Sequence, residues 1–174
     1  MHCLVVAHDG AAALRKRLKL VFFACAFIAA VPVMVFSQSI EVVHGGERVS
    51  VDLTAEPALF PRTRFETSTV WTETSDLYEG VLLKDLLAHL GANLSAPSGR
   101  VVVEALDGYS AEIEFGLITE EAPLLAFLRN GHLMPRRAQG PYWLIFPYDH
   151  DARYRTESVY AQSVWQVTRL TIFD

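Results

Sequence analysis

The chain has no cysteine after residue 37, because both of its cysteines, Cys3 and Cys25, belong to the first 37 residues. A domain made of the later residues therefore has no disulfide, no thiolate nucleophile and no cysteine ligand for a metal. A disulfide would be permitted in an exported compartment, so the stability of this domain must come from side-chain packing alone.

The later residues also lack an excess of positive charge. Residues 1–37 hold four of the 15 Lys and Arg residues and one of the 20 Asp and Glu residues, so residues 38–174 carry 11 basic and 19 acidic side chains, a formal net charge of −8. Binding to phosphate backbones needs a basic surface, which argues against nucleic acid as a partner. The sequence also has no Ser-His-Asp order, phosphate-binding glycine loop or zinc-binding helix that would indicate a hydrolase.

The start of the chain predicts an export signal. A basic segment at residues 15–19 precedes an apolar, uncharged run at residues 20–36, and Val35 and Ser37 suit a signal-peptidase site. We predict that residues 1–39 are a signal peptide, or else an uncleaved N-terminal anchor, because the apolar run is at the lower limit for crossing a bilayer. Either alternative leaves residues 40–174 as one exported domain, which would be periplasmic in a bacterium.

Asn130 and Gly131 form the clearest turn signal in the chain. They follow the apolar run 124–128, and both central residues of a type I′ turn need a positive φ angle, which Asn and Gly adopt readily. The sequence therefore predicts a hairpin here.

A further strand is predicted shortly after this hairpin. Residues 142–146 are aromatic or branched and follow the break at Gly140-Pro141, which is typical of a buried strand. The loop before the break contains Arg136 and Arg137. Two guanidinium groups beside a Gly-Pro turn could bind an anion, although arginines on such a loop are more often ordinary surface residues.

The rest of the pattern predicts one clear helix among mostly antiparallel strands. Leucines at positions 83, 86, 87 and 90 recur at helical spacing, and Gly91 stands where a left-handed residue ends a helix. Alternating or β-branched runs predict further strands at residues 40–44, 48–53, 66–72, 100–106, 110–115 and 163–172. We expect residues 57–69 to be extended or irregular, Thr119 to cap a single helical turn, and the fold class to be α+β.

Several segments, taken in order, resemble the molybdopterin-binding oxidoreductase domain of the sulfite oxidase family, in particular its small, exported, single-domain members. The segments are residues 80–87, 105–109, 125–135, 139–147 and 163–165, and the likeness extends from about residue 41 to residue 173. The resemblance implies a sulfite-oxidase-type molybdopterin-binding fold. It also implies a pterin pyrophosphate in a groove between the sheet and the loops, with molybdenum held by the pterin dithiolene and one protein cysteine.

The sequence departs from this family at two positions that concern chemistry. The family's cysteine corresponds to about residues 67–71, where this chain offers only hydroxyl groups, which are poor substitutes for a thiolate on molybdenum. Catalytic relatives often carry a lysine just before the tryptophan that matches Trp165, and this chain has Val164. Both changes weaken the case for the usual oxidoreductase chemistry.

A small set of residues is predicted to bind the cofactor or another ligand. They are Ser68, Thr69, Trp71, Asp107, Tyr109, Arg129, Asn130, Arg136 and Tyr148. The resemblance places the hairpin of Asp107 and Tyr109 near the groove, whereas the alternative is that Asp107-Gly108 is only a type I′ turn. Trp71 is large enough to wall a planar ligand, but an aromatic residue is more often part of the core. We predict no metal site from the adjacent Asp149, His150 and Asp151, since neighbouring residues point in different directions.

Two functions are compatible with these patterns, and the sequence leaves open whether the chain is an enzyme. The preferred hypothesis is a non-catalytic module that binds a small anionic or pterin-like ligand, with molybdopterin among the candidates, and presents it to a membrane sensor or an enzyme. The alternative is an active molybdopterin oxidoreductase whose metal is ligated without cysteine. A purely structural partner-binding domain has no sequence feature in its favour.

Overall fold

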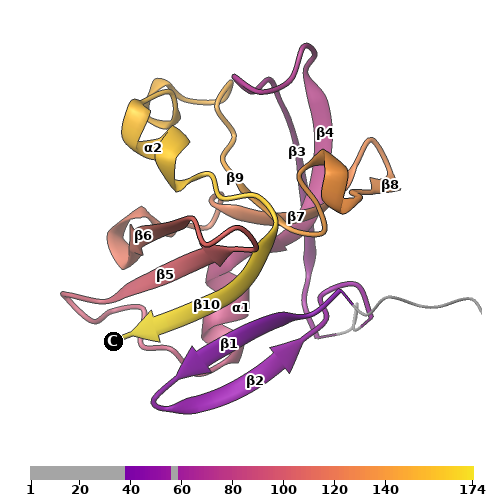
Figure 1. Cartoon of the computed structure of the whole chain (residues 1–174). Helices are drawn as coiled ribbons and strands as arrows, with labels where there is room; N and C mark the ends of the chain where they lie inside the picture. Colours follow the sequence, from indigo (N-terminus) through magenta and orange to yellow (C-terminus); the bar gives the residue numbers. More distant parts are fainter. Residues whose placement is uncertain (1–37, 56–58) are drawn as a thin grey trace, which may run out of the picture. The chain divides into compact units, whose positions relative to one another are not determined.

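The computed structural model describes residues 38–55 and 59–174 (Figure 1). Residues 1–37 of the predicted export segment lie outside the described residues. Within these ranges no helix is long and apolar enough to cross a membrane.

The first sheet has five strands in the order β2-β1-β10-β5-β6. Its strands are β1 (Ile40–His44), β2 (Glu47–Val51), β5 (Arg100–Ala105), β6 (Ser110–Glu114) and β10 (Val167–Phe173). β1 and β10 run parallel, and the other neighbours in this sheet are antiparallel. The chain thus returns at its end to pair with both the first strand and β5, which brings the segment before β10 next to the β5–β6 hairpin.

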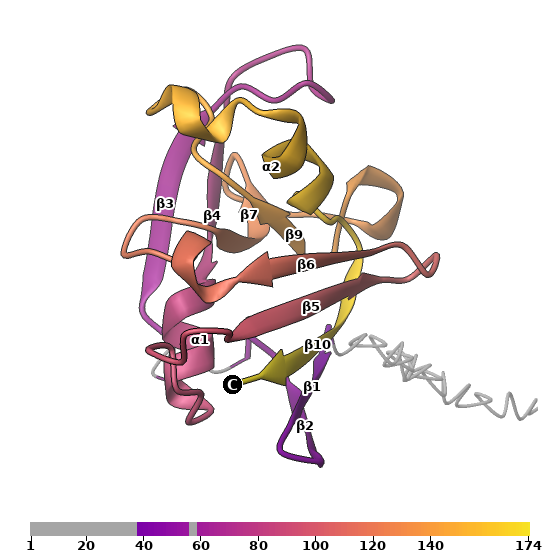
Figure 2. The same ribbon diagram turned by 90° about the vertical axis from the view of Figure 1, so that its left-hand side faces the viewer.

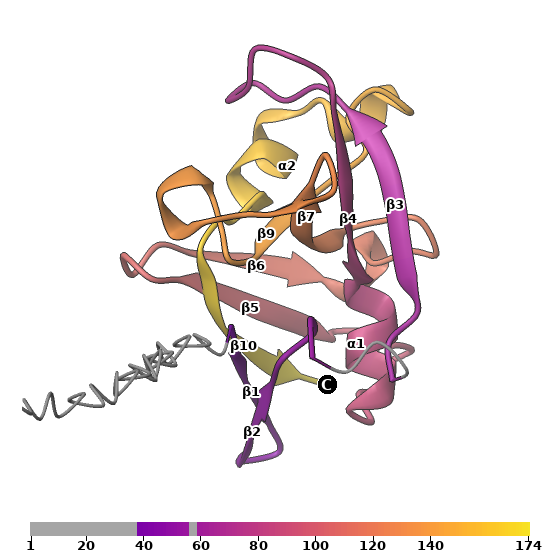
Figure 3. The same cartoon turned by 90° about the vertical axis from the view of Figure 1, so that its right-hand side faces the viewer.

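The second sheet is antiparallel and contains β3 (Arg62–Thr67), β4 (Asp76–Leu82), β7 (Leu124–Arg129) and β8 (His132–Leu133), with β9 (Trp143–Ile145) also paired to β7. Asn130 and Gly131, between β7 and β8, have φ angles of 52° and 78°. The predicted type I′ hairpin is therefore confirmed. The long strands β3 and β4 run steeply across β5 and β6 of the first sheet (Figure 3).

Two short α-helices and three 3-10 turns connect the strands. They are α1 (Leu83–His89), α2 (Glu157–Gln162), η1 (Phe115–Leu117), η2 (Arg136–Ala138) and η3 (Ala152–Tyr154). The predicted helix is α1, which buries its leucine face completely and is followed by Gly91 at a φ of 79°. α2 packs against β6 (Figure 2).

The buried side chains form two clusters. The larger one lies between the sheets and α1 and is mostly aliphatic. The second joins β4, β7 and β9 to the chain around α2 and is rich in aromatic rings. Its aromatic members are Phe65, Tyr78, Trp143, Phe146, Tyr148 and Tyr154, with Trp71, Tyr160 and Trp165 packed against them. The partly buried rings of this second cluster border the candidate site.

Some predicted elements are wrong in place or in type. The strand predicted at residues 66–72 is in fact β3, which ends at Thr67, so that residues 68–75 form a loop (the 68–75 loop). Only two residues of β3 are buried, which is why residues 57–69 resembled an irregular connection. The C-terminal strand begins at Val167 and not at residue 163.

Two elements were not predicted. β4 was missed because Gly80 suggested the start of the helix, whereas the structure needs glycine there because the backbone of β7 lies against it. α2 was missed because it has only one buried residue, Val159, too few to show a helical period.

Two turn predictions need correction. Thr119 does not cap a helical turn; its Oγ1 accepts hydrogen bonds from the backbone of Glu121 and Ala122 in a non-helical loop. Gly108 has a positive φ of 88°, but Asp107 does not, so the β5–β6 turn is not type I′. The hairpin itself is confirmed, and its tip is longer because Ala105 N pairs with Tyr109 O across the turn.

The substitution Gly80→Ala tests the close approach of β4 and β7. An added Cβ would lie 2.1 Å from the Leu125 carbonyl oxygen and 2.7 Å from Ala126 Cα, and backbone atoms in a paired strand cannot move aside cheaply. We expect the free energy of unfolding in urea to fall by about 2–3 kcal/mol. Gly116→Ala is the matched control, because a Cβ there meets nothing within 4 Å. Equal stability of the two variants would contradict this packing.

Candidate functional site

A pocket of about 360 Å³ opens where the β5–β6 hairpin, the 68–75 loop and the segment after α2 meet. We call it the aromatic pocket. Its lining consists of Trp71, Ala105, Asp107, Tyr109, Tyr160, Ala161, Ser163, Val164 and Trp165. Three of the predicted site residues, Trp71, Asp107 and Tyr109, are therefore brought together here from segments that are distant in the sequence.

The ring of Trp71 is the centre of the aromatic side of this pocket. It lies 5.6 Å from Trp165 and 5.8 Å from Tyr160 between ring centroids, with interplanar angles of 86° and 88°. Buried Trp143 and Tyr148 contact the same ring at 5.8 Å and 6.5 Å. Edge-to-face contacts of this kind stabilise each ring position beyond simple burial, so the pocket has right-angled aromatic walls that are held from behind.

The floor behind these walls is closed by hydrogen bonds to Ser163. The Tyr148 hydroxyl lies 2.5 Å from Ser163 Oγ, which donates to the Val159 carbonyl at 2.7 Å, and Trp143 Nε1 donates to the Ser163 carbonyl at 3.3 Å. Burial raises the pKa of Tyr148 well above its ordinary value, so the phenol stays neutral. Tyr148, a predicted ligand-binding residue, therefore supports the pocket from within the core and does not line it.

Tyr109 fixes the wall that the β5–β6 hairpin forms. Its hydroxyl donates to the Ala161 carbonyl at 2.7 Å, and Gln162 Nε2 donates to the Glu112 carbonyl at 3.0 Å, so the hairpin is tied to α2 at two points. Asp107 accepts a hydrogen bond from Tyr109 N at 3.0 Å. Asp107 therefore shapes this turn, which is not the type I′ turn of the sequence alternative, and it also lines the pocket.

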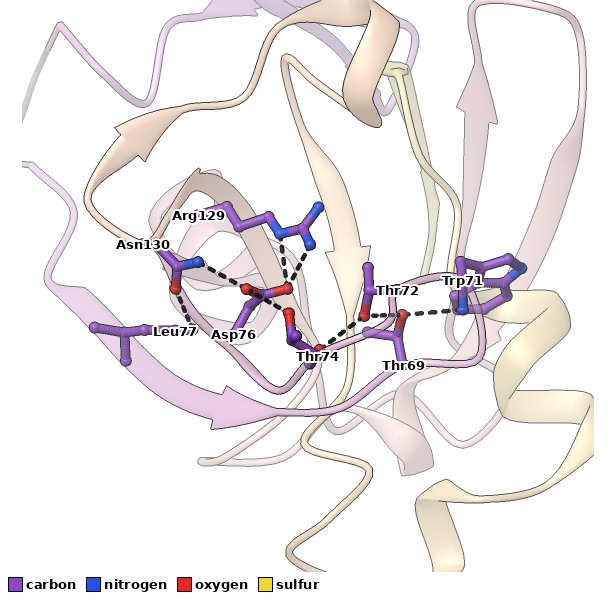
Figure 4. Close-up of polar contacts among 8 residues, drawn as sticks. All are labelled: Thr69, Trp71, Thr72, Thr74, Asp76, Leu77, Arg129 and Asn130. Atoms are coloured by element: carbon purple, nitrogen blue, oxygen red, sulfur yellow. Dashed lines mark hydrogen bonds and ion pairs between the residues drawn. The ribbon is translucent and has the colours of Figure 1, made fainter.

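The 68–75 loop positions Trp71 through a series of hydrogen bonds (Figure 4). Trp71 N donates to Thr69 Oγ1 at 3.1 Å, and the hydroxyls of Thr69 and Thr72 are 2.9 Å apart. Thr72 Oγ1 donates to the Thr74 carbonyl, and Thr74 Oγ1 donates to Asp76 at 3.4 Å. Thr69, another predicted ligand-binding residue, therefore acts inside the loop.

Asp76 anchors the end of this loop. Its carboxylate accepts hydrogen bonds from Arg129 Nε at 2.9 Å and Nη2 at 2.5 Å and from Asn130 Nδ2 at 2.7 Å. Burial acts to raise the pKa of Asp76, but the hydrogen bonds from Asn130 and Arg129 and the charge of Arg129 outweigh it, so the pKa lies below its ordinary value. The predicted site residues Arg129 and Asn130 therefore hold the fold and do not line the aromatic pocket.

Ser68 is held by a second carboxylate. Its backbone N and its Oγ donate to Asp149 at 2.6 Å and 2.8 Å, and these bonds keep the pKa of Asp149 below its ordinary value. Thr67 is fully buried, and its Oγ1 accepts from Asp149 N at 3.2 Å and donates to the Ser68 carbonyl. The hydroxyls of Thr67, Ser68 and Thr69 thus all have partners within the protein.

Arg136, the remaining predicted site residue, lines a different pocket. This second pocket, of about 400 Å³, is bordered by Gln38, Ser39, Leu106, Arg136, Pro141, Gln166, Val167 and Thr168. Gln166 Nε2 donates to the Arg136 carbonyl at 2.6 Å, which fixes the backbone of the loop and leaves the guanidinium exposed. Arg136 therefore belongs to a separate surface from Trp71.

The residues of the aromatic pocket do not fit a molybdenum–pterin group. A pterin pyrophosphate needs cationic or backbone donors, and the lining has no Lys or Arg, while its one acidic residue, Asp107, would repel a phosphate. The hydroxyls of Thr67, Ser68 and Thr69 are hard donors already bonded inside the loop. Among the described residues, no group of three or more His, Cys, Asp or Glu side chains is placed to hold a metal ion.

Comparison with known proteins places the fold. No protein-family model matches the chain, and no curated protein matches it. Among solved structures it is similar to the sulfane dehydrogenase SoxCD from Paracoccus pantotrophus, with 20% sequence identity and a TM-score of 0.57. The match covers 78% of this chain and 38% of that one, so this chain spans well under half of its neighbour's length.

This similarity concerns the fold alone. The predicted α+β class with mostly antiparallel strands is confirmed, with two short helices in place of one. The comparison shows a distant structural relation to this dehydrogenase and does not establish a family for the chain.

Several pocket residues were missed from the sequence as ligand-binding candidates. Tyr160, Ala161 and Ser163 belong to α2 and its end, which was not predicted. Trp165 was named from the sequence only as part of the family resemblance and not as a ligand-binding candidate. The spacing of two aromatic residues around Ser163 was the available signal, but only the contact with Trp71 gives it meaning.

The substitution Asp76→Asn tests the anchor of the 68–75 loop. Because the folded-state pKa of Asp76 lies below its unfolded value, the carboxylate stabilises the fold above about pH 4 and loses this contribution as the pH falls through the folded pKa. We expect D76N to lower the free energy of unfolding by about 2 kcal/mol at pH 7. Between about pH 5 and pH 2, the free energy of unfolding of D76N should fall less than that of the wild type.

Urea unfolding at pH 3 and pH 7 measures both effects of this change. The control is Glu66→Gln, an exposed carboxylate on β3, which should change stability by less than about 0.5 kcal/mol at pH 7. A wild-type pH dependence in D76N would show that this carboxylate does not anchor the loop.

Proposed function

We propose that residues 40–174 form a non-catalytic ligand-binding module of an exported protein, which holds a small organic ligand in the aromatic pocket. The observation that carries this proposal is the set of right-angled rings around an open volume of about 360 Å³. Pockets for small ligands commonly have volumes of about 300–1,000 Å³ and mostly apolar or aromatic walls with few polar groups. A planar, pterin-like molecule is the ligand class that the family resemblance suggests.

The chemistry of the lining supports binding rather than catalysis. The lining has no Cys, His, Lys or Arg, so it offers no thiolate, imidazole or amine as nucleophile or base. Ser163 Oγ lies between the Tyr148 hydroxyl and the Val159 carbonyl, and neither of these groups can take its proton as a base. The alternative of an active molybdopterin enzyme would require a metal ligand from Thr67, Ser68 or Thr69, and these hydroxyls already have hydrogen-bond partners.

Export and a partner complete the proposal. An exported module with an open pocket could present its ligand to a membrane sensor or an enzyme, and the covered share of SoxCD, 38% of that chain, fits a module that works with other domains or proteins. Sequencing of the mature N-terminus after expression in a secreting bacterium tests the export step.

A ligand screen tests the binding function. All three tryptophans of the chain lie in or behind the pocket, so intrinsic tryptophan fluorescence reports on binding without a label. We expect at least one member of a panel of pterins, nucleotides, organic acids and organic cations to raise the melting temperature and change this emission.

The variant Trp165→Ala should weaken that binding about tenfold or more, because it removes one aromatic wall. Val70→Ala, which truncates a neighbouring exposed side chain outside the pocket, is the control and should bind as the wild type does. A panel without any response in either measurement would contradict the proposed function.

Metal analysis separates the module from an active molybdenum enzyme. We expect protein purified from a host that makes the molybdenum cofactor to contain molybdenum at background level by mass spectrometry, since the hydroxyls at residues 67–69 are engaged. A stoichiometric molybdenum content would overturn this expectation and favour the enzyme.

A further inference from the structure

The shape of the aromatic pocket favours a compact group over its ring faces. Trp71 stands nearly perpendicular to both Tyr160 and Trp165. A group seated in the angle between two perpendicular rings lies over the face of both, and it is the ring face, not the edge, that carries negative charge density. Contact with such walls stabilises the binding of neutral apolar groups, and it stabilises the binding of cations more.

The charge at the pocket also has one sign. Asp107 is the only acidic residue of the lining, and no basic residue lines the pocket. In the described part of the chain, Asp107 forms no ion pair with a Lys, Arg or His side chain. The whole chain has a formal net charge of −5. The carboxylate at the pocket therefore remains available to a ligand of opposite charge.

The wall that the β5–β6 hairpin forms is held in place before any ligand arrives. Tyr109 is 49% exposed, yet its hydroxyl is fixed by the Ala161 carbonyl, and its backbone N–H is fixed by Asp107. The same hydrogen bond orients the Asp107 carboxylate. The aromatic rings and the carboxylate are therefore held rigidly before binding. This order in advance reduces the entropy cost of binding a ligand.

We infer that the ligand of the aromatic pocket is an organic cation of quaternary-ammonium type, held over the rings of Trp71, Tyr160 and Trp165 and paired with Asp107. This inference rests on the proposed ligand-binding function and names its ligand class. Aromatic walls supply the cation–π attraction, and the carboxylate supplies the counter-charge. An anionic ligand would meet no cation in this lining and would be repelled by Asp107.

Matched probes separate charge from shape. Choline and benzyltrimethylammonium are each titrated beside the neutral compound in which carbon replaces the nitrogen, with tryptophan emission and calorimetry as readouts. The protein is used as the expressing host processes it. We expect each cation to bind about tenfold or more tightly than its neutral isostere, because a desolvated cation–π contact contributes that much.

The substitution Asp107→Asn assigns the counter-charge. Asn keeps the oxygen that accepts the hydrogen bond from Tyr109 N, so the hairpin and the melting temperature should be unchanged. We expect D107N to weaken binding of the cations about threefold to tenfold and to leave the neutral isosteres unaffected. Glu47→Gln, on β2 at the opposite edge of the same sheet, is the control for net charge and should leave both affinities unchanged.

The outcomes separate the inferred class of ligand from the proposed ligand-binding function. Equal affinity for a cation and its isostere, or tighter binding of an anionic or neutral planar compound from the panel, overturns the inference and leaves the binding module standing. If neither cation binds while another compound does, the inference is likewise overturned and the binding module stands. No response to any probe or panel member overturns the inference and the proposed function together.

Discussion

The buried carboxylate of Asp76 is the interaction on which the candidate site depends. It joins the start of β4 to Arg129 and Asn130 at the β7–β8 turn and, through Thr74, to the 68–75 loop. Removing a charge from such a group would leave Arg129 without its counter-ion inside the structure. Because the same loop carries Trp71, the central ring of the aromatic pocket, an ion pair outside the pocket sets the position of its main wall.

The hydroxyl groups of residues 67–69 belong to the protein's internal hydrogen bonding. Ser68 donates to Asp149 through its backbone N and its Oγ, and Thr67 Oγ1 accepts from Asp149 N. The adjacent space is bordered by aromatic rings and one carboxylate, with no cation. A fold similar to that of a sulfane dehydrogenase thus carries a pocket whose lining has one carboxylate and no thiol, imidazole or amine.

The pocket is also built from parts that stay in place for independent reasons. Trp143 and Tyr148 are buried in the second cluster, which is rich in aromatic rings, and they support Trp71 whether or not a ligand is present. The β5–β6 hairpin is tied to α2 by Tyr109. Walls that are held in this way lose little conformational entropy when a ligand binds.

The sequence by itself determined the features that depend on neighbouring residues. The Asn130-Gly131 turn, the leucine face of α1 and the alternation in β6 follow from local dihedral preferences and from hydrophobic period, and all were predicted. Only the tertiary structure decided the roles of the candidate residues. Arg129 and Asp76 are 53 positions apart, and Trp71 meets Trp165 across most of the domain. No local pattern encodes such pairs, because contacts between distant segments arise only once the sheets and loops have packed together.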